Sequence, residues 1–316
     1  MTSVMNRRAL LGLVAASPFA SVAVVRAQTQ KVRIAAVPTD SFGLAFSALD
    51  NGAFAKVGLD VELVQFPQAG PIANAVAGGA VDVGLADPIQ LAQAVIRGLP
   101  FRYIAGGSLY SSKAPTTQLC VQQGGPIKSG KDLTGKTVGV YALGAFPEYA
   151  TRAWLEAQGV DITTIKLFEV PSGSMAAAIA RGVVAAGVVS EPFLSQAPAV
   201  GVVPFAKVYD ACAPSFYNNG WFVTTTWLQA NPDLARRVVT AVYETARWAE
   251  THHADTLQIL AKYGKLDTVA AAHMNRAVWA TSMNVDALKP PLALGWRYHA
   301  MDRQVAVSEL VAPSAR

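Results

Sequence analysis

Residues 65–88, QFPQAGPIANAVAGGAVDVGLADP, predict the end of a strand, a loop, a short helix, a tight turn, a second strand and another loop. Gly78 is expected to end the helix, because glycine is common just past a helix C-terminus. Residues 80–85 form a short apolar run, which is typical of a strand covered on both faces. The loops at Gln68 and Asp87 would then follow the carboxyl ends of strands, where open α/β sheets bind ligands.

The same pattern occurs a second time, roughly one hundred residues later in the chain. GVDI at 159–162 repeats GLDV at 58–61, and Glu191-Pro192 takes the place of Asp87-Pro88. A repeat with so long a period indicates that the fold itself is built from two similar units. Two copies are too few for a solenoid. The sequence therefore predicts two similar α/β lobes that face each other.

Composition limits the possible classes of protein. The chain of 316 residues is 52% hydrophobic and 15% charged, which suits one large or two medium domains with a sizeable core. The net charge is +5, and the three arginines of the first 27 residues account for all but +2 of it. So small an excess, without a basic stripe, argues against nucleic-acid binding.

Residues 1–27 are predicted to be an export signal. Asn6-Arg7-Arg8 supplies positive charge, residues 9–25 supply an apolar stretch interrupted by Pro18, and small residues precede a cleavage site before Gln28. The alternative is a membrane anchor, for which the stretch is short. The paired arginines leave the twin-arginine and general secretory routes both open. Either route predicts a periplasmic protein, and no cysteine follows the signal to carry a lipid.

Cys120 and Cys212 are the two cysteines of the chain. In an oxidising compartment they either pair or remain two small buried apolar residues, and the sequence leaves both possibilities open. Two cysteines without a close histidine make a poor metal site. No metal site, cofactor or catalytic residue is therefore expected.

Other elements are predicted from capping residues and apolar spacing. Asp40 or Ser41 is expected to cap a helix that runs to about Val57, and Asp87 to cap a helix over 88–97. Strands are expected at 31–37, 61–66, 101–105, 118–122, 137–141 and 215–225, and C-terminal helices at 231–251, 270–280 and 290–311.

Four segments together resemble a known family: GAFAKVGLDV at 52–61, AGGAVDVG at 77–84, PIKSGKDLTGKTVGV at 126–140 and SEPF at 190–193. In their order and spacing the chain is similar to the periplasmic substrate-binding proteins of ABC importers, in the nitrate/sulfonate/taurine and pyrimidine-precursor group. The resemblance covers essentially the whole mature chain.

This resemblance implies an α/β fold of two lobes, the type II arrangement, in which each lobe is a mixed sheet flanked by helices. Residues 28–119 and 222–316 would form the first lobe, together with the C-terminal helices, and residues 120–221 the second. Two crossing strands, near 118–122 and 218–225, would act as the hinge on which the lobes close.

Helix N-termini that point into one cleft would offer N–H groups to a ligand. Some candidates have simpler interpretations: Asp40, Ser41 and Asp87 as helix caps, Phe42, Phe146 and Trp221 as core, and Glu191 as part of a turn. The residues expected to bind the ligand are Thr39, Asp40, Ser41, Phe42, Gln68, Asp87, Gly144, Ala145, Phe146, Glu191, Asn218 and Trp221.

Sulfonate binders of the resembled family carry small hydroxyl residues in the second-lobe loop, whereas residues 144–147 here read GAFP. The expected cleft offers Asp40, Asp87 and Glu191 and no arginine, which favours an organic solute with an apolar or aromatic part and an N–H donor over a simple inorganic anion.

The resemblance implies a monomeric solute-binding component that takes a sulfonate-, pyrimidine- or aromatic-like solute to a membrane permease and its ATPase. One alternative is a pyrimidine synthase of the same fold, which is expected to carry a cysteine-rich motif and an active-site histidine. Neither is visible in the sequence. The other alternative is a receptor that presents the solute to a sensor kinase.

Overall fold

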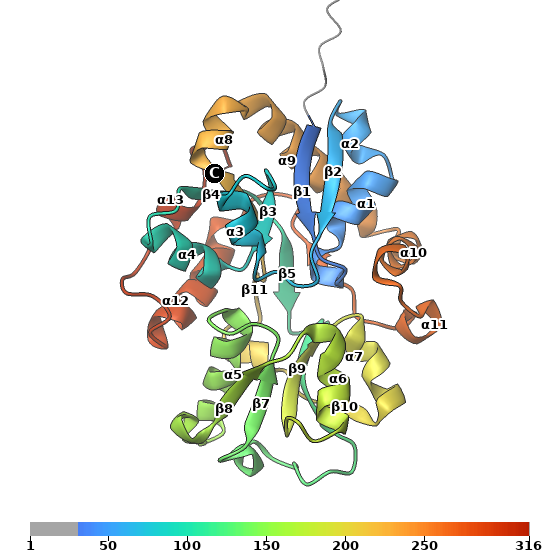
Figure 1. Ribbon diagram of the computed structural model, residues 1–316, viewed down its shortest axis with the longest axis vertical. Helices are drawn as coiled ribbons and strands as arrows, with labels where there is room; N and C mark the ends of the chain where they lie inside the picture. Colours follow the sequence, from blue (N-terminus) through green and yellow to red (C-terminus); the bar gives the residue numbers. More distant parts are fainter. Residues whose placement is uncertain (1–30, 316) are drawn as a thin grey trace, which may run out of the picture.

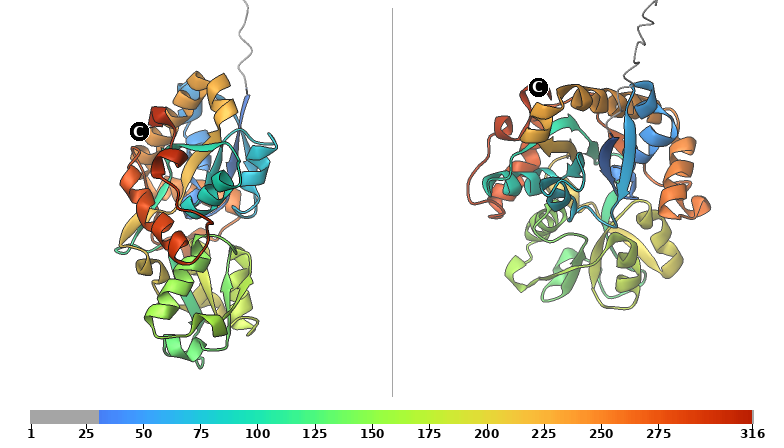
Figure 2. Two further views of the ribbon diagram at one scale, coloured as in Figure 1. Left: turned by 90° about the vertical axis from the view of Figure 1, so that its left-hand side faces the viewer. Right: turned by 45° about the horizontal axis from the view of Figure 1, so that its top comes forward.

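The computed structural model describes residues 31–315, which form two α/β lobes stacked one above the other (Figure 1). The predicted export signal and its cleavage site lie outside these residues. Turned views show the second lobe as a separate layer below the first (Figure 2). The predicted two-lobe α/β architecture is therefore confirmed.

The first lobe contains a two-stranded sheet, β2-β1, and a three-stranded sheet, β3-β12-β4, which lie side by side in the order β2-β1-β3-β12-β4. Its strands are β1 (Lys31–Ala36), β2 (Asp60–Gln65), β3 (Gly84–Ala86), β4 (Phe101–Gly106) and β12 (Gly220–Thr224). Strands β1 and β2 are parallel, and a parallel bridge between Ile34 and Val83 links β1 to β3. Strand β12 lies antiparallel between β3 and β4.

The second lobe repeats this order as β8-β7-β9-β6-β10. Its strands are β6 (Thr117–Gln122), β7 (Thr137–Val140), β8 (Lys166–Glu169), β9 (Ala186–Ser190) and β10 (Val202–Ala206). Strand β7 is parallel to β8 and β9, and β6 lies antiparallel between β9 and β10. The internal repeat in the sequence is thus a repeat of sheet topology.

Matching glycines fix matching turns in the two lobes. Gly58 and Gly159 both have a φ near the left-handed region, at 73° and 74°, and Gly79 and Gly182 do so at 70° and 71°. Only glycine adopts this conformation without a steric cost, so each copy needs it at the same place. Gly79 follows α3 (Ile72–Ala77), which ends where the sequence predicted.

Helices cover both sheets. In the first lobe these are α1 (Leu44–Asp50), α2 (Ala53–Lys56), α3, α4 (Pro88–Ile96), α8 (Thr225–Ala230), α9 (Pro232–Ala249), α10 (His253–Gly264), α11 (Thr268–Ala271), α12 (Lys289–Arg297) and α13 (Val307–Leu310). The second lobe has α5 (Phe146–Ala157), α6 (Ser172–Ala180) and α7 (Phe193–Gln196). The C-terminal helices return to the first lobe (Figure 1).

The crossing strands are not where the sequence predicted them. Residues 118–122 belong to β6, inside the second sheet, and 220–224 belong to β12, inside the first. A separate three-stranded sheet at the junction consists of β5 (Ser108–Ser111), β11 (Ser215–Tyr217) and β13 (Val278–Trp279). The chain therefore crosses through β5 and β11, which pair antiparallel.

Three predicted helices are also shorter than expected. The helix that was expected to run to Val57 is a 3-10 turn, η1 (Asp40–Phe42), followed by α1 and α2, because Gly52 takes a φ of 76° between them. Residues 270–280 contain the end of α11 and strand β13, and 290–311 contain α12, a loop and α13. Apolar spacing alone did not show these breaks.

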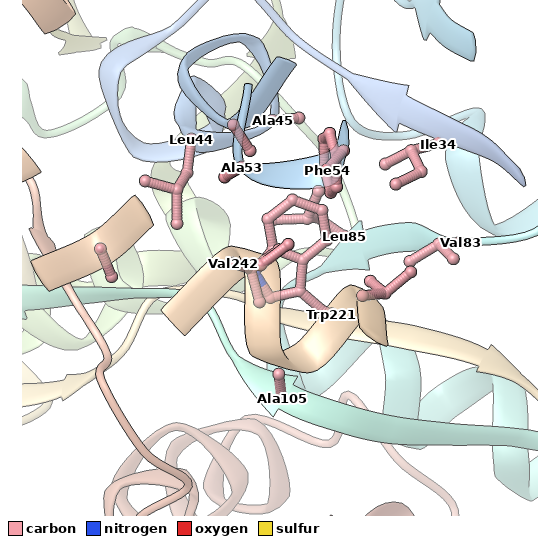
Figure 3. Packing of buried hydrophobic residues seen from close by; sticks show 14 of the residues in the cluster. Ile34, Leu44, Ala45, Ala53, Phe54, Val83, Leu85, Ala105, Trp221 and Val242 are labelled. Atoms are coloured by element: carbon pink, nitrogen blue, oxygen red, sulfur yellow. The ribbon is translucent and has the colours of Figure 1, made fainter. Parts of the chain in front are cut away.

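Trp221 of β12 is at the centre of the first lobe's core. It is fully buried and packs among Phe54, Leu85 and Val242 (Figure 3). A buried aromatic ring of this size contributes much of the packing in the core around it. The first lobe therefore needs the strand that carries this ring between two other strands. The first lobe therefore depends on a strand that the chain forms only after it has left the second lobe.

Asn219 fastens the junction between β11 and β12. Its side-chain oxygen accepts the N–H of Ser108 at 3.0 Å, and its amide nitrogen donates to the carbonyl of Ser41 at 3.0 Å and to the hydroxyl of Ser108 at 2.9 Å. The side chain is fully buried. Gly107 permits this approach, because a Cβ there would lie 2.1 Å from the Asn219 oxygen.

Replacing Gly107 by alanine should therefore lower the free energy of unfolding by about 1–3 kcal/mol, the usual cost of inserting a methyl group into packed structure. Urea denaturation would measure it. Gly70→Ala is the matched control, because a Cβ at Gly70 meets nothing within 4 Å. Equal stability of the two variants would contradict the close packing of Gly107 on Asn219.

Candidate functional site

A cleft of about 620 Å³, counting its open mouth, lies between the two lobes. Its walls are the loops that follow β1, β2 and β3 in the first lobe and β7, β8 and β9 in the second, with one residue from the β11–β12 junction. The cleft is lined by Val37, Thr39, Ser41, Phe42, Pro67, Gln68, Ala69, Asp87, Gln90, Tyr141, Ala142, Ala145, Phe146, Pro147, Ser172, Ser190 and Asn218.

The two lobes supply equivalent loops to this cleft. Each contributes the carboxyl ends of three strands, which is where open α/β sheets bind ligands. Helices α4, α5 and α6 begin at the same loops, so their N-termini lie at the cleft. Gln68 and Asp87, from two of the first-lobe loops, both line this cleft.

Eight of the twelve residues expected from the sequence line the cleft. They come from five different segments of the chain, which only the fold brings together. They are Thr39, Ser41, Phe42, Gln68, Asp87, Ala145, Phe146 and Asn218.

Asp87 caps α4 and also faces the cleft, so the helix-cap and the cleft interpretations of this residue are compatible. Oδ1 accepts the N–H of Ile89 at 2.9 Å and of Gln90 at 3.1 Å, which leaves Oδ2 outside the cap. Burial raises the pKa of this carboxyl to about 6, although the N–H groups of Gln90, Ile89 and Phe146 counteract the shift. Phe146 belongs to the second lobe, so Asp87 lies where the lobes meet.

Asp40 is not a cleft residue and does not cap a helix. It is fully buried, and its carboxylate binds the guanidinium of Arg276 at 2.8 Å and accepts the backbone N–H of Ala277. This role could not be predicted from sequence, because the partner of Asp40 lies 236 residues away. Asp40 holds the C-terminal segment against the first lobe.

Glu191 occupies the position equivalent to Asp87 but does not line the cleft. Its carboxylate accepts the N–H of Ser195 at 3.0 Å and the hydroxyl of Ser195 at 2.9 Å, both from the adjoining helix α7. Burial raises its pKa to about 7. The residue before it, Ser190, lines the cleft instead.

Gly144 and Trp221 are also placed away from the cleft lining. Gly144 takes a φ of 68° and donates its N–H to Glu148 at 2.8 Å, so it shapes the loop before α5. Trp221 is core, the simpler of its two interpretations.

Sequence reasoning missed nine lining residues, and most are neighbours of expected ones. Ser172 had a signal of its own: Pro171-Ser172 in the second copy matches Pro67-Gln68 in the first, so the repeat placed it opposite Gln68. The other missed residues are Val37, Pro67, Ala69, Gln90, Tyr141, Ala142, Pro147 and Ser190.

The polar wall of the second lobe is a hydroxyl chain. The Tyr141 hydroxyl is hydrogen-bonded to that of Tyr209, and the Ser190 hydroxyl to that of Thr117 at 2.9 Å. Burial raises the pKa of Tyr141 to about 12, so its phenol stays neutral near pH 7. The hydroxyls absent from the 144–147 loop are thus partly supplied by Ser172 and Ser190.

Both cysteines are free, and Cys120 is buried in β6. Among residues 31–315, no group of three or more His, Cys, Asp or Glu side chains is placed to hold a metal ion. Within the same range, none of the helices has the length and apolar character needed to span a bilayer.

A family model described as NMT1/THI5 like matches residues 40–255. No curated protein sequence matches the chain.

Solved structures share the fold. The ligand-binding component of an ABC-type import system from Staphylococcus aureus, solved with zinc bound, has a TM-score of 0.77 at 14% identity, covering 90% of this chain and 97% of that one. The nitrate-binding protein NrtA from Synechocystis has a TM-score of 0.76 at 15% identity, covering 90% and 86%. The aliphatic sulphonate binding protein SsuA from Escherichia coli has a TM-score of 0.73 at 18% identity, covering 90% and 98%.

Removing the Asp40 carboxylate should strand the guanidinium of Arg276, whose side chain is only 13% exposed. Asp40→Ala is expected to cost about 3 kcal/mol or more in the free energy of unfolding. The control is Asp233→Ala, which breaks a solvent-exposed pair with Arg236 and should cost much less. Chemical denaturation compares the two, and similar losses would show that the buried pair has no structural role.

Asp87 predicts a pH-dependent difference in stability. Because its pKa is raised in the folded state, the folded protein binds this proton more tightly than the unfolded chain, and deprotonation destabilises it. Asp87→Asn keeps an N-cap acceptor, so in the absence of solute it should gain stability over wild type as pH rises from about 4 to about 6. The gain should reach at most about 3 kcal/mol.

Urea unfolding at several pH values between 4 and 8 measures this difference. Asp161→Asn is the control: Asp161 also caps a short helix, but the hydroxyl and N–H of Thr163 lower its pKa. Its replacement should show no gain in stability over the same rise in pH, because a lowered pKa changes the stability mainly below about pH 4. A pH-independent Asp87→Asn difference would show that the carboxyl is not desolvated.

Proposed function

This chain belongs to the NMT1/THI5 like family, and from that premise we propose that it is the solute-binding component of an ABC-type importer. It binds one small organic solute in the cleft between its lobes and delivers it to a membrane permease. The observation that carries the proposal is the cleft itself, whose walls are equivalent loops from two lobes. The proposal places the protein in the periplasm, as a monomer and without a cofactor.

Closure of the lobes would follow from this geometry. A solute that touches both walls is bound fully only when the lobes approach, so it shifts the population towards the closed form. The lobes already meet on one flank, where the N–H of Asp40 donates to the carbonyl of Glu191 at 3.3 Å. On the other flank, Arg297 of α12 binds Glu156 of α5 at 2.6 Å. The closed form would be the one the permease recognises.

The residues of the cleft support binding without catalysis. Neither a histidine nor a cysteine is among those that line it. Burial raises the pKa of the Cys120 thiol to about 12, which is opposite to what a nucleophilic cysteine needs. The remaining polar groups are hydroxyls, amides and one carboxyl, which suit the orientation of a solute.

A thermal-shift screen tests the proposal, because a solute that binds only the folded protein raises its melting temperature. The panel should contain amines, amidines, pyrimidines, aromatic acids, sulfonates and nitrate. Chromatography of the same samples would reveal any product, and turnover would replace the binding proposal with an enzymatic one.

Blocking the cleft should abolish the shift. Ala142 lines the cleft, so Ala142→Trp is expected to reduce affinity for the solute by at least tenfold in calorimetry. Leu143→Trp is the matched control, because the adjacent Leu143 is 45% exposed and is not part of the lining. Equal affinities in the two variants would place the binding site elsewhere.

A further inference from the structure

The charges at the cleft are of one sign. Among the residues that line it, Asp87 is the one carboxylic acid, and none is lysine, arginine or histidine. Two arginines on neighbouring elements bind carboxylates of their own: Arg152 binds Glu148 at 2.9 Å, and Arg276 binds Asp40 at 2.8 Å. Neither is available to offset the charge of Asp87 or to hold an anionic solute.

The groups that surround Asp87 are dipoles and neutral phenols. From its own helix come the N–H groups of Ile89 and Gln90, and from α5 that of Phe146. Four tyrosines also interact electrostatically with the Asp87 carboxylate. Burial raises the pKa of each phenol, so all four remain neutral near pH 7. They are Tyr103, Tyr141, Tyr149 and Tyr209. An ionised Asp87 thus has no cationic partner among these groups.

A desolvated carboxylate of this kind repels an anion and attracts a cation, strongly so where water is excluded. Nitrate or a sulfonate placed in this cleft would meet Asp87 without a compensating positive charge. A cationic nitrogen with N–H donors would neutralise it and form charge-assisted hydrogen bonds.

Gln68 supplies a second polar contact. Its side-chain oxygen is buried and has no hydrogen-bond partner among residues 31–315, although the residue lines the cleft. A buried acceptor without a partner is costly, and a donor from the solute would remove that cost. Because an amide can rotate to present oxygen or nitrogen, Gln68 adds hydrogen bonding but does not choose the sign of the charge.

On the basis of the proposed solute-binding function, we propose that the solute is an organic cation with N–H donors, an amine or amidinium on an apolar or aromatic body. Asp87 is the residue that selects its charge, Gln68 accepts a second donor, and Phe42 and Val37 contact the apolar body.

Probes with one body and different head groups test this selection. Benzylamine and benzamidine carry the cation, benzyl alcohol is neutral, and benzoate and benzenesulfonate are anionic. Calorimetry on the wild-type protein should show the two cations binding at least tenfold more tightly than the other three. Asp87→Asn should remove most of this preference by weakening the cations at least tenfold. Asp161→Asn, which also replaces a capping aspartate but lies away from the cleft, should leave it unchanged.

A titration of the wild-type protein with pH gives the same information without a variant of Asp87. Affinity for benzylamine should fall as pH drops below about 6, where the carboxyl becomes protonated. Glu191 also titrates near neutral pH, so the titration is repeated in Glu191→Gln, where the fall should persist.

The inference is overturned if the tightest solute, in this series or in the wider panel, is an anion or lacks an N–H donor. It is also overturned if Asp87→Asn retains the affinity for cations to within twofold. In both cases the solute-binding proposal survives. If no solute of the panel binds to wild type, the proposed function itself fails.

Discussion

The structure depends on one topological constraint: the central antiparallel strand of the first sheet is formed by chain that returns from the second lobe. Strand β12 lies between β3 and β4 and carries Trp221 into the core of the first lobe. Since that strand cannot be supplied from within residues 31–106, the chain has to cross the junction twice, through β5 and β11. As a result of this crossing, the carboxyl ends of the strands in one lobe face those of the other lobe. The cleft lies between these two sets of strand ends.

Much of this could be predicted from local sequence. Each strand–loop–helix unit of the repeat, each glycine turn and the cap at Asp87 depends on residues that lie within a few positions of one another. The chemistry of those neighbouring residues is enough to predict the local structure. The crossing strands and the short C-terminal elements could not be predicted in this way, because pairing partners decide them. Trp279, for example, is in a strand only because Ser108 lies beside it. Asp40 shows the same limit for the site, since Arg276 determines its role.

Burial of Asp87 connects the stability of the protein with its proposed task. Folding places a carboxyl where its charged form is disfavoured, and the capping N–H groups offset only part of that cost. A solute that neutralises the group would recover the remainder as binding free energy. The empty protein is therefore less stable than its fold permits, as is common where function requires a destabilised group.

Equivalent residues in the two copies of the repeat have different roles. Asp87 and Glu191 follow equivalent strands, yet Asp87 faces the cleft while Glu191 binds Ser195 of the adjoining helix α7. Gln68 and Ser172 also occupy equivalent positions, and both face the cleft, one with an amide and the other with a hydroxyl. Had both acids faced the cleft, two desolvated carboxylates would repel each other and oppose closure. Because Glu191 binds Ser195 of α7 instead of facing the cleft, the duplicated scaffold can close around a single negative charge.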